Sequence, residues 1–481
     1  MKSNMFKKVS YALFAVFAAL SLQAKNVNLE FCNVIGDGKT DNTKALQAAI
    51  DECSSTGGGE VIFPKDGGVF LSKTLFLKDN VTLNLSPNTV LKANAKNFGK
   101  GRFISANGAT NIGLKGGGTV DGSGADFPIG EVGGRAHMFI LTDCKNVRIE
   151  DIKITASSCW NLFLQRCDTV FINNIHLTSH ANWNNDGIDI EAKNVVISNS
   201  IIDCDDDAIC PKSHSRDFIV ENITITNCII SSNCNFIKFG TANQGGFRNV
   251  AISNCVLKKC TQSNFRKWDT HFKSAGVTAP ITGIGGIAIE AVDGGFAERI
   301  TVSNLAMTDV QTPIFIRVGH RNKDEQKSYI KDVIISNITA TSESWFSNSI
   351  TSVPGHALEN VIVRDCIFNM KGAMPEREAE KLMEKKIPEQ IAGYPENRMF
   401  GNLPGYGFYI RHAKNITLDN IQLNAIGGEF RHAIVADDVN SIRIMNGIFE
   451  APKGDADAIN FIDCKDVYQF NNKIVKNNVK A

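Results

Sequence analysis

From residue 146 onward, the chain repeats a short pattern in which apolar and polar positions alternate. The pattern reads NVRIEDI at 146, TVFINNI at 169, NVVISNS at 194 and NITITNC at 222, and it continues to SIRIMNG at 441. Alternation with a period of two, in segments rich in Val, Ile and Thr, predicts a β-strand in each copy. The sixth position of each copy is an Asn or Asp, namely Asp151, Asn174, Asn199, Asn227, Asn254, Asn304, Asn337, Asp365, Asn420 and Asn446.

A repeat of this kind is typical of a solenoid, because one unit buries its apolar face only when a neighbour stacks on it. It predicts an all-β fold, a single-stranded right-handed parallel β-helix. Length alone would suggest two or three domains, but the continuous repeat indicates one domain over residues 25–481. Two wide steps of 50 and 55 residues indicate either two coils each or one coil with an insertion, near 260–285 and 370–410. The recurring Asn and Asp are interpreted as a structural ladder whose side chains bond the backbone of adjacent coils.

Residues 1–24 have the pattern of a secretory signal peptide, with Lys2, Lys7 and Lys8 before the apolar run YALFAVFAAL and SLQA after it. The run is too short for a stable membrane-spanning helix, so we expect no membrane anchor and a periplasmic or secreted protein. Apolar residues at helical spacing over 43–53 then predict a helix that caps the open end of the solenoid.

Charge and cysteine content narrow the class of protein further. The formal charge is +1, and removal of the three lysines in residues 1–24 would change it to −2, which argues against nucleic acid as a partner. The thirteen cysteines show no zinc-site spacing, and Cys228, Cys255 and Cys366 directly follow the ladder position. We therefore expect cysteines in or beside the core, with one or two disulfides left open for an exported protein.

The candidate chemistry lies in two clusters of aspartate. Asp186 and Asp189 lie in the run NNDGID, and Asp203, Asp205, Asp206 and Asp207 lie in DCDDDAICPKS. The clusters are about one repeat apart, so they should stack on one face of the β-helix. Grouped carboxylates suit acid/base chemistry, because like charges raise the pKa of one member and keep it protonated. A calcium site in the DCDDD run is the alternative interpretation.

Several segments together resemble the polygalacturonases of glycoside hydrolase family 28, within the pectate-lyase-like superfamily. They are GDGKTDNTKALQAAIDEC with GGGEVIFP, NNDGIDIEAKNVVIS and DDDAICPKS. The late segment GYPENRMFGNLPGYGFYIRHAKNITLDN resembles a bacterial subgroup. The resemblance covers nearly the whole chain after residue 24. It implies hydrolysis of α-linked uronic-acid polymers, chiefly pectin, with inversion and with three aspartates and no metal or cofactor.

The resemblance also implies a role for each aspartate. Asp206 would be the general acid on the glycosidic oxygen, while Asp186 and Asp207 would be bases that hold and deprotonate the attacking water. Inverting hydrolysis needs one protonated and one ionised carboxyl group about 6.5–9.5 Å apart, with room for water between them.

The chain departs from the family at three positions that bind substrate. Asn235 stands where the family has a histidine, and Ala288 and Glu290 stand where it has the cations of an Arg-Ile-Lys segment. An anionic sugar that faced Glu290 would meet repulsion, so either other cations bind it or Glu290 bonds the hydroxyls of a neutral sugar. The candidate substrate-binding residues are Asn184, Asp189, Lys212, Asn235, Lys238, Glu290, Arg317, His320 and Arg411.

The expected function is inverting hydrolysis of a plant cell-wall polysaccharide or oligosaccharide, above all a pectic one, by a monomer. The insertion near 370–410 would border the site, which favours exo action or trimming of oligosaccharides. Two alternatives remain open: a lyase with calcium and Lys238 as base, and a glycan-binding relative without catalysis.

Overall fold

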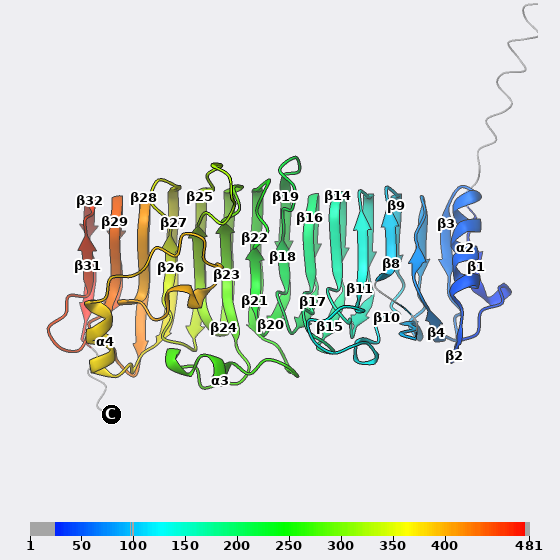
Figure 1. The fold of residues 1–481 in the computed structure, drawn as a ribbon, viewed down its shortest axis with the longest axis horizontal. Helices are drawn as coiled ribbons and strands as arrows, with labels where there is room; N and C mark the ends of the chain where they lie inside the picture. Colours follow the sequence, from blue (N-terminus) through cyan, green and yellow to red (C-terminus); the bar gives the residue numbers. More distant parts are fainter. Residues whose placement is uncertain (1–24, 97, 99–100, 477–481) are drawn as a thin grey trace, which may run out of the picture.

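The computed structural model describes residues 25–96, 98 and 101–476, so the predicted signal peptide lies outside the described residues. In the described part, 33 strands pair in parallel and form one continuous sheet that winds into an elongated right-handed β-helix (Figure 1). The fold class predicted from the repeat is therefore confirmed. None of the helices in the described ranges is long and apolar enough to cross a membrane.

The bounds of the strands and helices are as follows. The strands are β1 (Val27–Asn28), β2 (Asp37–Asp41), β3 (Gly59–Ile62), β4 (Gly68–Ser72), β5 (Leu75–Phe76), β6 (Val81–Asn84), β7 (Thr89–Ala93), β8 (Gly101–Asn107), β9 (Thr110–Lys115), β10 (Thr119–Asp121), β11 (Ala136–Thr142), β12 (Lys145–Glu150), β13 (Lys153–Thr155), β14 (Leu162–Asn173), β15 (His176–Ser179), β16 (Ile188–Ser198), β17 (Ile201–Cys204), β18 (Ile209–Pro211), β19 (Val220–Thr226), β20 (Ile229–Ser232), β21 (Asn235–Phe239), β22 (Phe247–Lys259), β23 (Gly283–Ala291), β24 (Phe296–Val318), β25 (Tyr329–Ser342), β26 (Asn348–Thr351), β27 (Ala357–Lys371), β28 (Gly405–Ile426), β29 (His432–Met445), β30 (Ile448–Glu450), β31 (Ile459–Ile462), β32 (Lys465–Phe470) and β33 (Lys473–Val475). The helices are η1 (Leu29–Phe31), α2 (Thr43–Ser55), η2 (Gly124–Asp126), α3 (Trp268–His271), η3 (Lys273–Ala275), α4 (Glu376–Met383) and η4 (Asn397–Phe400).

Strands of successive coils stack in register around an aliphatic core. On one face, β14, β16, β18, β21, β23 and the end of β24 follow one another, and their inward side chains form the continuous row Leu162, Ile188, Ile209, Ile237, Ile287 and Ile314. Neighbouring side chains of a strand point to opposite faces, so the residues between these positions point outward from the same strands. This outward row positions the candidate site.

The ladder residues stabilise the turns, but not through the predicted backbone bonds. Asn174 donates to the Asp151 carboxylate at 2.6 Å, and Asn337 donates to the Asn304 side chain at 3.1 Å. All ten ladder residues have φ between 52 and 56°. Asn and Asp tolerate this left-handed conformation better than other residues with a Cβ, which explains their recurrence in the turn.

The two wide steps are single coils with insertions. Asn304 bonds the Asn254 side chain at 3.1 Å across the step of 50, and Asn420 bonds Asp365 at 2.8 Å across the step of 55. The first insertion, residues 260–282, carries α3, and the second insertion, residues 372–404, carries α4 and η4. Both lie outside the strand layers (Figure 1).

Helix α2 caps the N-terminal end of the coil stack, as predicted (Figure 1). Its buried face consists of Leu46, Ala49, Ile50 and Cys53. The described ranges contain all thirteen cysteines, and none of them forms a disulfide. Most are buried, so they act as small apolar side chains in and beside the core.

Candidate active site

The three aspartates predicted as catalytic come from two adjacent coils. Asp186 lies just before β16, and Asp206 and Asp207 lie in the turn between β17 and β18. Strands β16 and β18 pair directly, and the Gly187 amide donates to the Asp207 carbonyl at 2.9 Å. Corresponding positions of paired strands are about 4.8 Å apart, so a spacing of one coil brings the three carboxyl groups together.

Asp203 and Asp205, from the same acidic run, hold the first insertion in place. Asp203 accepts hydrogen bonds from the Thr261 amide at 3.1 Å and the Thr261 hydroxyl at 2.6 Å. Asp205 accepts one from the Ser263 hydroxyl at 3.1 Å. These two carboxylates therefore fasten the insertion to the turn that carries the candidate catalytic pair.

The first insertion brings Arg266 to Asp206. The Arg266 Nη2 atom lies 2.5 Å from Asp206 Oδ2, and Nη1 donates to the Asp205 carbonyl at 2.7 Å. The other carboxylate oxygen of Asp206 accepts from the Asp207 amide at 2.9 Å. The guanidinium also lies over the Trp183 ring, 5.3 Å from its centre. Both oxygens of Asp206 thus accept hydrogen bonds from the chain itself.

Asp207 is surrounded by donors. Its Oδ1 accepts from the Asn235 side chain at 2.7 Å, and its Oδ2 lies 3.2 Å from Lys238 Nζ. Burial alone would raise the pKa of Asp207, but the charges of Lys238 and Lys212 and the Asn235 bond outweigh it and hold the pKa well below its usual range. Asp207 is therefore an ionised carboxylate, suited to accept a proton.

Asp186 and Asp189 share one cation. Lys212 Nζ lies 3.6 Å from Asp186 Oδ2 and 3.1 Å from Asp189 Oδ1. Burial and the charges of Asp189 and Asp206 raise the pKa of Asp186 well above its usual value. Burial also raises the pKa of Asp189 to about 7, although Lys212 opposes the shift. The cluster thus separates a proton-holding side from an ionised side, as paired acid and base groups require.

Glu290 is a buried carboxyl group on β23. It is 1 % exposed, and neither carboxylate oxygen has a hydrogen-bond partner in the described part of the chain. It packs over Gly240, where a Cβ would lie only 3.1 Å from Glu290 Oε2. Burial raises the pKa of Glu290 to about 8 against the opposing charge of Lys238. At neutral pH it is mostly protonated, so the repulsion expected between Glu290 and an anionic sugar is largely removed.

We expect Glu290→Gln to weaken the pH dependence of the free energy of unfolding. Glutamate ionises near pH 4.3 in an unfolded chain but near pH 8 here, so between these values unfolding releases a proton. Wild-type stability should therefore fall with rising pH, by up to about 1.4 kcal/mol per pH unit from this group. Urea unfolding from pH 5 to pH 8 measures the slope, with Glu325→Gln, at an exposed glutamate, as control. Equal slopes for wild type and Glu290→Gln would contradict the assignment.

Arg317 and His320 contact the second insertion instead of the aspartates. Arg317 Nη2 donates to the carbonyls of Glu389 and Gln390 at 2.7 and 3.0 Å. The His320 backbone amide donates to the Ile391 carbonyl at 2.8 Å, and its ring lies 3.3 Å from the His356 ring, nitrogen to nitrogen. Their contacts therefore support the insertion, and their predicted role in substrate binding stays a prediction.

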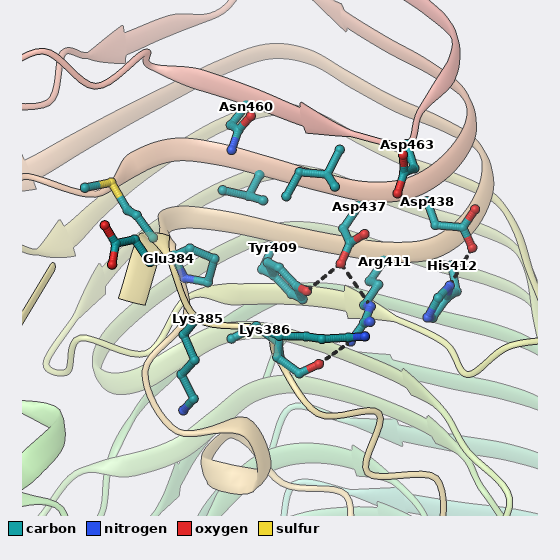
Figure 2. Close-up of a pocket in the computed structure, with 15 residues that line it drawn as sticks. Glu384, Lys385, Lys386, Tyr409, Arg411, His412, Asp437, Asp438, Asn460 and Asp463 are labelled. Carbon is teal, nitrogen blue, oxygen red and sulfur yellow. Dashed lines mark hydrogen bonds and ion pairs between the residues drawn. The ribbon is translucent and has the colours of Figure 1, made fainter. Parts of the chain in front are cut away.

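Arg411 lies on β28 in a separate pocket of about 520 Å³ beside the second insertion (Figure 2). Its Nη2 is 2.5 Å from Glu389 Oε1, and its Nε is 3.1 Å from Asp437 Oδ2. Asp437 also accepts from the Tyr409 hydroxyl at 3.1 Å. The charge of Arg411 is thus balanced within this pocket, away from the strands that carry the aspartates.

Arg266 and Glu396 belong to the site but are not predicted by the sequence pattern. Glu396 lies in the second insertion, is buried, pairs with Arg398 at 2.7 Å, and interacts electrostatically with Lys238 and Asp207 of the site; burial raises its pKa. Asn184 lies at the edge of the site, where its Oδ1 accepts from Arg135 at 3.0 Å. The only signal for Arg266 and Glu396 in the sequence is their position inside the two wide steps of the repeat.

The donors around the aspartate pair do not favour a calcium ion. Oxygens of Asp206 and Asp207 and the sulfur of Cys234 lie within 4.8 Å of one another. Arg266 and Lys238 already pair with these carboxylates, and a cation would have to displace both. The arrangement fits an ion-pair network that positions acid and base groups.

Comparison with known proteins shows similarity to one enzyme family. Residues 53–266, which include all three predicted catalytic aspartates, match the sequence profile "Glycosyl hydrolases family 28". The chain is 25% identical over 340 residues to an exopolygalacturonase of Zea mays, covering 64% of this chain and 75% of that protein. It is 25% identical over 331 residues to an endo-polygalacturonase of Pectobacterium carotovorum subsp. carotovorum, covering 61% and 76%.

A solved structure supports the fold. The hyperthermoactive exopolygalacturonase from Thermotoga maritima superposes with a TM-score of 0.63 at 20% identity, over 87% of this chain and 96% of that one. The profile match, the curated relatives and the β-helix agree. Residues 53–266 are thus similar to glycosyl hydrolases family 28, and 61–64% of the chain is similar to the two polygalacturonases named above.

Proposed function

We propose that the protein is an inverting glycoside hydrolase that removes sugars from a pectic polysaccharide or oligosaccharide. The observation that carries this proposal is the placement of Asp186 beside Asp206 and Asp207 on adjacent coils of a family 28 fold. The names of the relatives, exopolygalacturonase and endo-polygalacturonase, support a pectic substrate.

In this reaction Asp206 protonates the glycosidic oxygen while the bond to the anomeric carbon breaks. A water molecule attacks the opposite face of the sugar and transfers its proton to the ionised Asp207. Burial and the neighbouring carboxylates raise the pKa of Asp186 well above its usual value, which makes it better suited to orient this water than to deprotonate it. One proton is thus donated and one accepted, and the configuration at the anomeric carbon inverts.

Exo action is supported by the second insertion. Tyr394 contacts Lys238 at 3.2 Å, beside the ionised Asp207, and Asn397 donates to the Ile284 carbonyl at 3.0 Å. Figure 1 shows the segment after α4 returning from the C-terminal coils toward the middle of the β-helix. A polymer that extended along the axis in this direction would meet the insertion, so we propose that the site receives a chain end.

The lyase alternative requires a neutral Lys238 that could remove a proton. Burial would lower the pKa of Lys238, but the charges of Asp207 and Glu290 outweigh it and raise the pKa well above its usual value. Lys238 is therefore a protonated partner of Asp207 and not a base, which supports hydrolysis over elimination.

We also propose that the protein is exported to the periplasm or beyond and acts as a monomer. The signal-peptide pattern of residues 1–24 supports export. The intact mass of the protein recovered from the cell envelope tests the cleavage near Ala24.

Product analysis tests the function. With oligogalacturonides and rhamnogalacturonan oligosaccharides, we expect the wild type to release a terminal monosaccharide from the earliest time points. Proton NMR should show the inverted anomer first, because water attacks the face opposite the leaving group. Products of intermediate length would contradict exo action. Absence of product from every pectic substrate would contradict the function and favour a glycan-binding relative without turnover.

A further inference from the structure

Three cations contact the candidate catalytic carboxylates in the described part of the chain, and Arg266 is the most exposed of them. Its side chain is 14% exposed, compared with 9% for Lys212 and 3% for Lys238. Lys212 is held between two aspartates, and Lys238 is held by Asp207 and the Tyr394 hydroxyl. Arg266 is therefore the cation that can leave its carboxylate with the smallest rearrangement.

The backbone around Arg266 is fixed independently of its guanidinium. The bonds from Thr261 to Asp203 and from Ser263 to Asp205 hold the first insertion against the β-helix. The Trp183 ring lies under the guanidinium and gives it an apolar surface on which to shift. The side chain can therefore change partner while the insertion stays in place.

The hydrogen bonds of Asp206 conflict with its role as general acid in the free protein. One oxygen accepts from the Asp207 amide and the other from Arg266. A carboxyl group that donates a proton to the glycosidic oxygen must carry that proton on an oxygen that faces the substrate. Arg266 must therefore leave Asp206 Oδ2 before Asp206 can act.

A uronic acid supplies the group that would draw Arg266 away. The planar guanidinium matches a carboxylate with two parallel hydrogen bonds, whereas a neutral sugar offers only hydroxyl groups. The chain also lacks cations at Ala288 and Glu290, so a uronate carboxylate near Asp206 would need Arg266 as its partner.

We propose that Arg266 binds the carboxylate of a uronic-acid residue in the substrate, and that its transfer from Asp206 frees Asp206 Oδ2 to take up and donate the proton. This inference rests on the proposed hydrolase function. The proton enters from solvent when the uronate binds, passes to the glycosidic oxygen, and is balanced by the proton that water gives to Asp207. When a neutral sugar binds, Arg266 stays on Asp206, so Asp206 takes up no proton and the glycosidic bond is not cleaved.

Calorimetric binding of D-galacturonate and D-galactose tests the inference without requiring turnover. In buffers of different ionisation enthalpy near pH 6, we expect galacturonate to bind the wild type with uptake of about one proton, and galactose to bind with none. Arg266→Gln should weaken galacturonate binding roughly ten-fold or more and abolish the proton uptake, with little change for galactose. Arg266→Lys, which keeps the charge but loses the paired donors, should fall between them.

Matched controls separate this role from a structural one. Arg248→Gln removes another arginine paired with a carboxylate, at 2.6 Å from Glu221, outside the site, and should leave binding and proton uptake unchanged. Thermal melting identifies any variant that fails to fold. If Arg266→Gln does not fold, galacturonate binding and proton uptake by Arg266→Lys test the inference instead. The inference would be overturned if Arg266→Gln kept the wild-type preference for galacturonate over galactose and the wild-type proton uptake. It would also be overturned if the wild type showed no preference for galacturonate. If the protein hydrolyses pectic substrates but does not prefer galacturonate over galactose, the proposed function is retained and the role of Arg266 is excluded. If the preference depends on Arg266 but no substrate is hydrolysed, only the proposed function is excluded.

Discussion

Replacement of Asp206 by asparagine is expected to lower kcat for pectic oligosaccharides by roughly 10³-fold or more. Asparagine has no proton to give to the leaving oxygen, but its carbonyl can still accept the bond from the Asp207 amide, so the turn should keep its shape. The loss should be much smaller with an aryl glycoside, whose leaving group needs little protonation. Asp207→Asn, which removes the base, should lose activity with both substrates. Initial rates of sugar release measure each effect.

Asp143→Asn serves as the matched control, because Asp143 is also an aspartate paired with an arginine, 2.7 Å from Arg166, but on the exposed surface. Its activity should equal that of the wild type. If Asp186→Asn kept its activity on the aryl glycoside and Asp206→Asn did not, Asp186 would be the general acid. Its raised pKa already favours the protonated form. Full activity of Asp206→Asn on every substrate would exclude it from the chemistry.

The fold could be predicted from the sequence because every coil must satisfy the same two physical requirements. The apolar positions of every copy must face the same core, and every turn needs a residue that accepts a positive φ, so the pattern recurs ten times. The nature of the ladder bonds could not be predicted, since backbone and side-chain acceptors of the adjacent coil are equally compatible with an asparagine in the turn. Asn174 and Asn337 show that side-chain acceptors are used.

The site was predictable to the extent that its residues lie on the repeat. Asp186, Asp207 and Lys238 lie on or beside paired strands, so sequence spacing alone places them on neighbouring coils. Arg266 lies in an insertion, and its contact with Asp206 depends on how that insertion folds back. The spacing of the repeat carries no information on how an insertion folds, so Arg266 could not be predicted from the sequence.

Protonation states were the other part that the sequence could not supply. Glu290 was expected to repel an anionic sugar because a glutamate in water is ionised. Its pKa depends on burial and on the lack of a hydrogen-bond donor among the described residues, and both are properties of the packed strands. The contacts of Arg317 could not be predicted either, because the carbonyls that it contacts belong to the second insertion, 72 and 73 residues away.

Replacement of Lys212 by methionine is expected to destabilise the protein by about 3–5 kcal/mol at neutral pH and above. Lys212 is the cation shared by Asp186 and Asp189, and all three side chains are at most 9% exposed. Methionine fills similar space but leaves two buried carboxyl groups without a counter-charge. Each must then either ionise at high cost or hold a proton that the unfolded chain would release. Chemical unfolding at several pH values measures the loss.

The pH dependence distinguishes this cause from poor packing. The pKa of Asp189 is already raised to about 7, and removal of Lys212 raises it further, so near pH 5 both carboxyl groups are protonated in the folded variant. The destabilisation relative to the wild type should therefore shrink as the pH falls from 8 to 5. Lys92→Met removes a 2.7 Å pair with Asp121 whose side chains are 32% and 20% exposed, and solvent should limit its effect to about 1 kcal/mol. Adding Asp189→Asn to Lys212→Met should recover part of the lost stability, because it removes one of the unpaired charges. A loss that is independent of pH and not recovered by Asp189→Asn would mean that Lys212 stabilises the coil through its packing on Trp160, 4.8 Å away, instead of through charge.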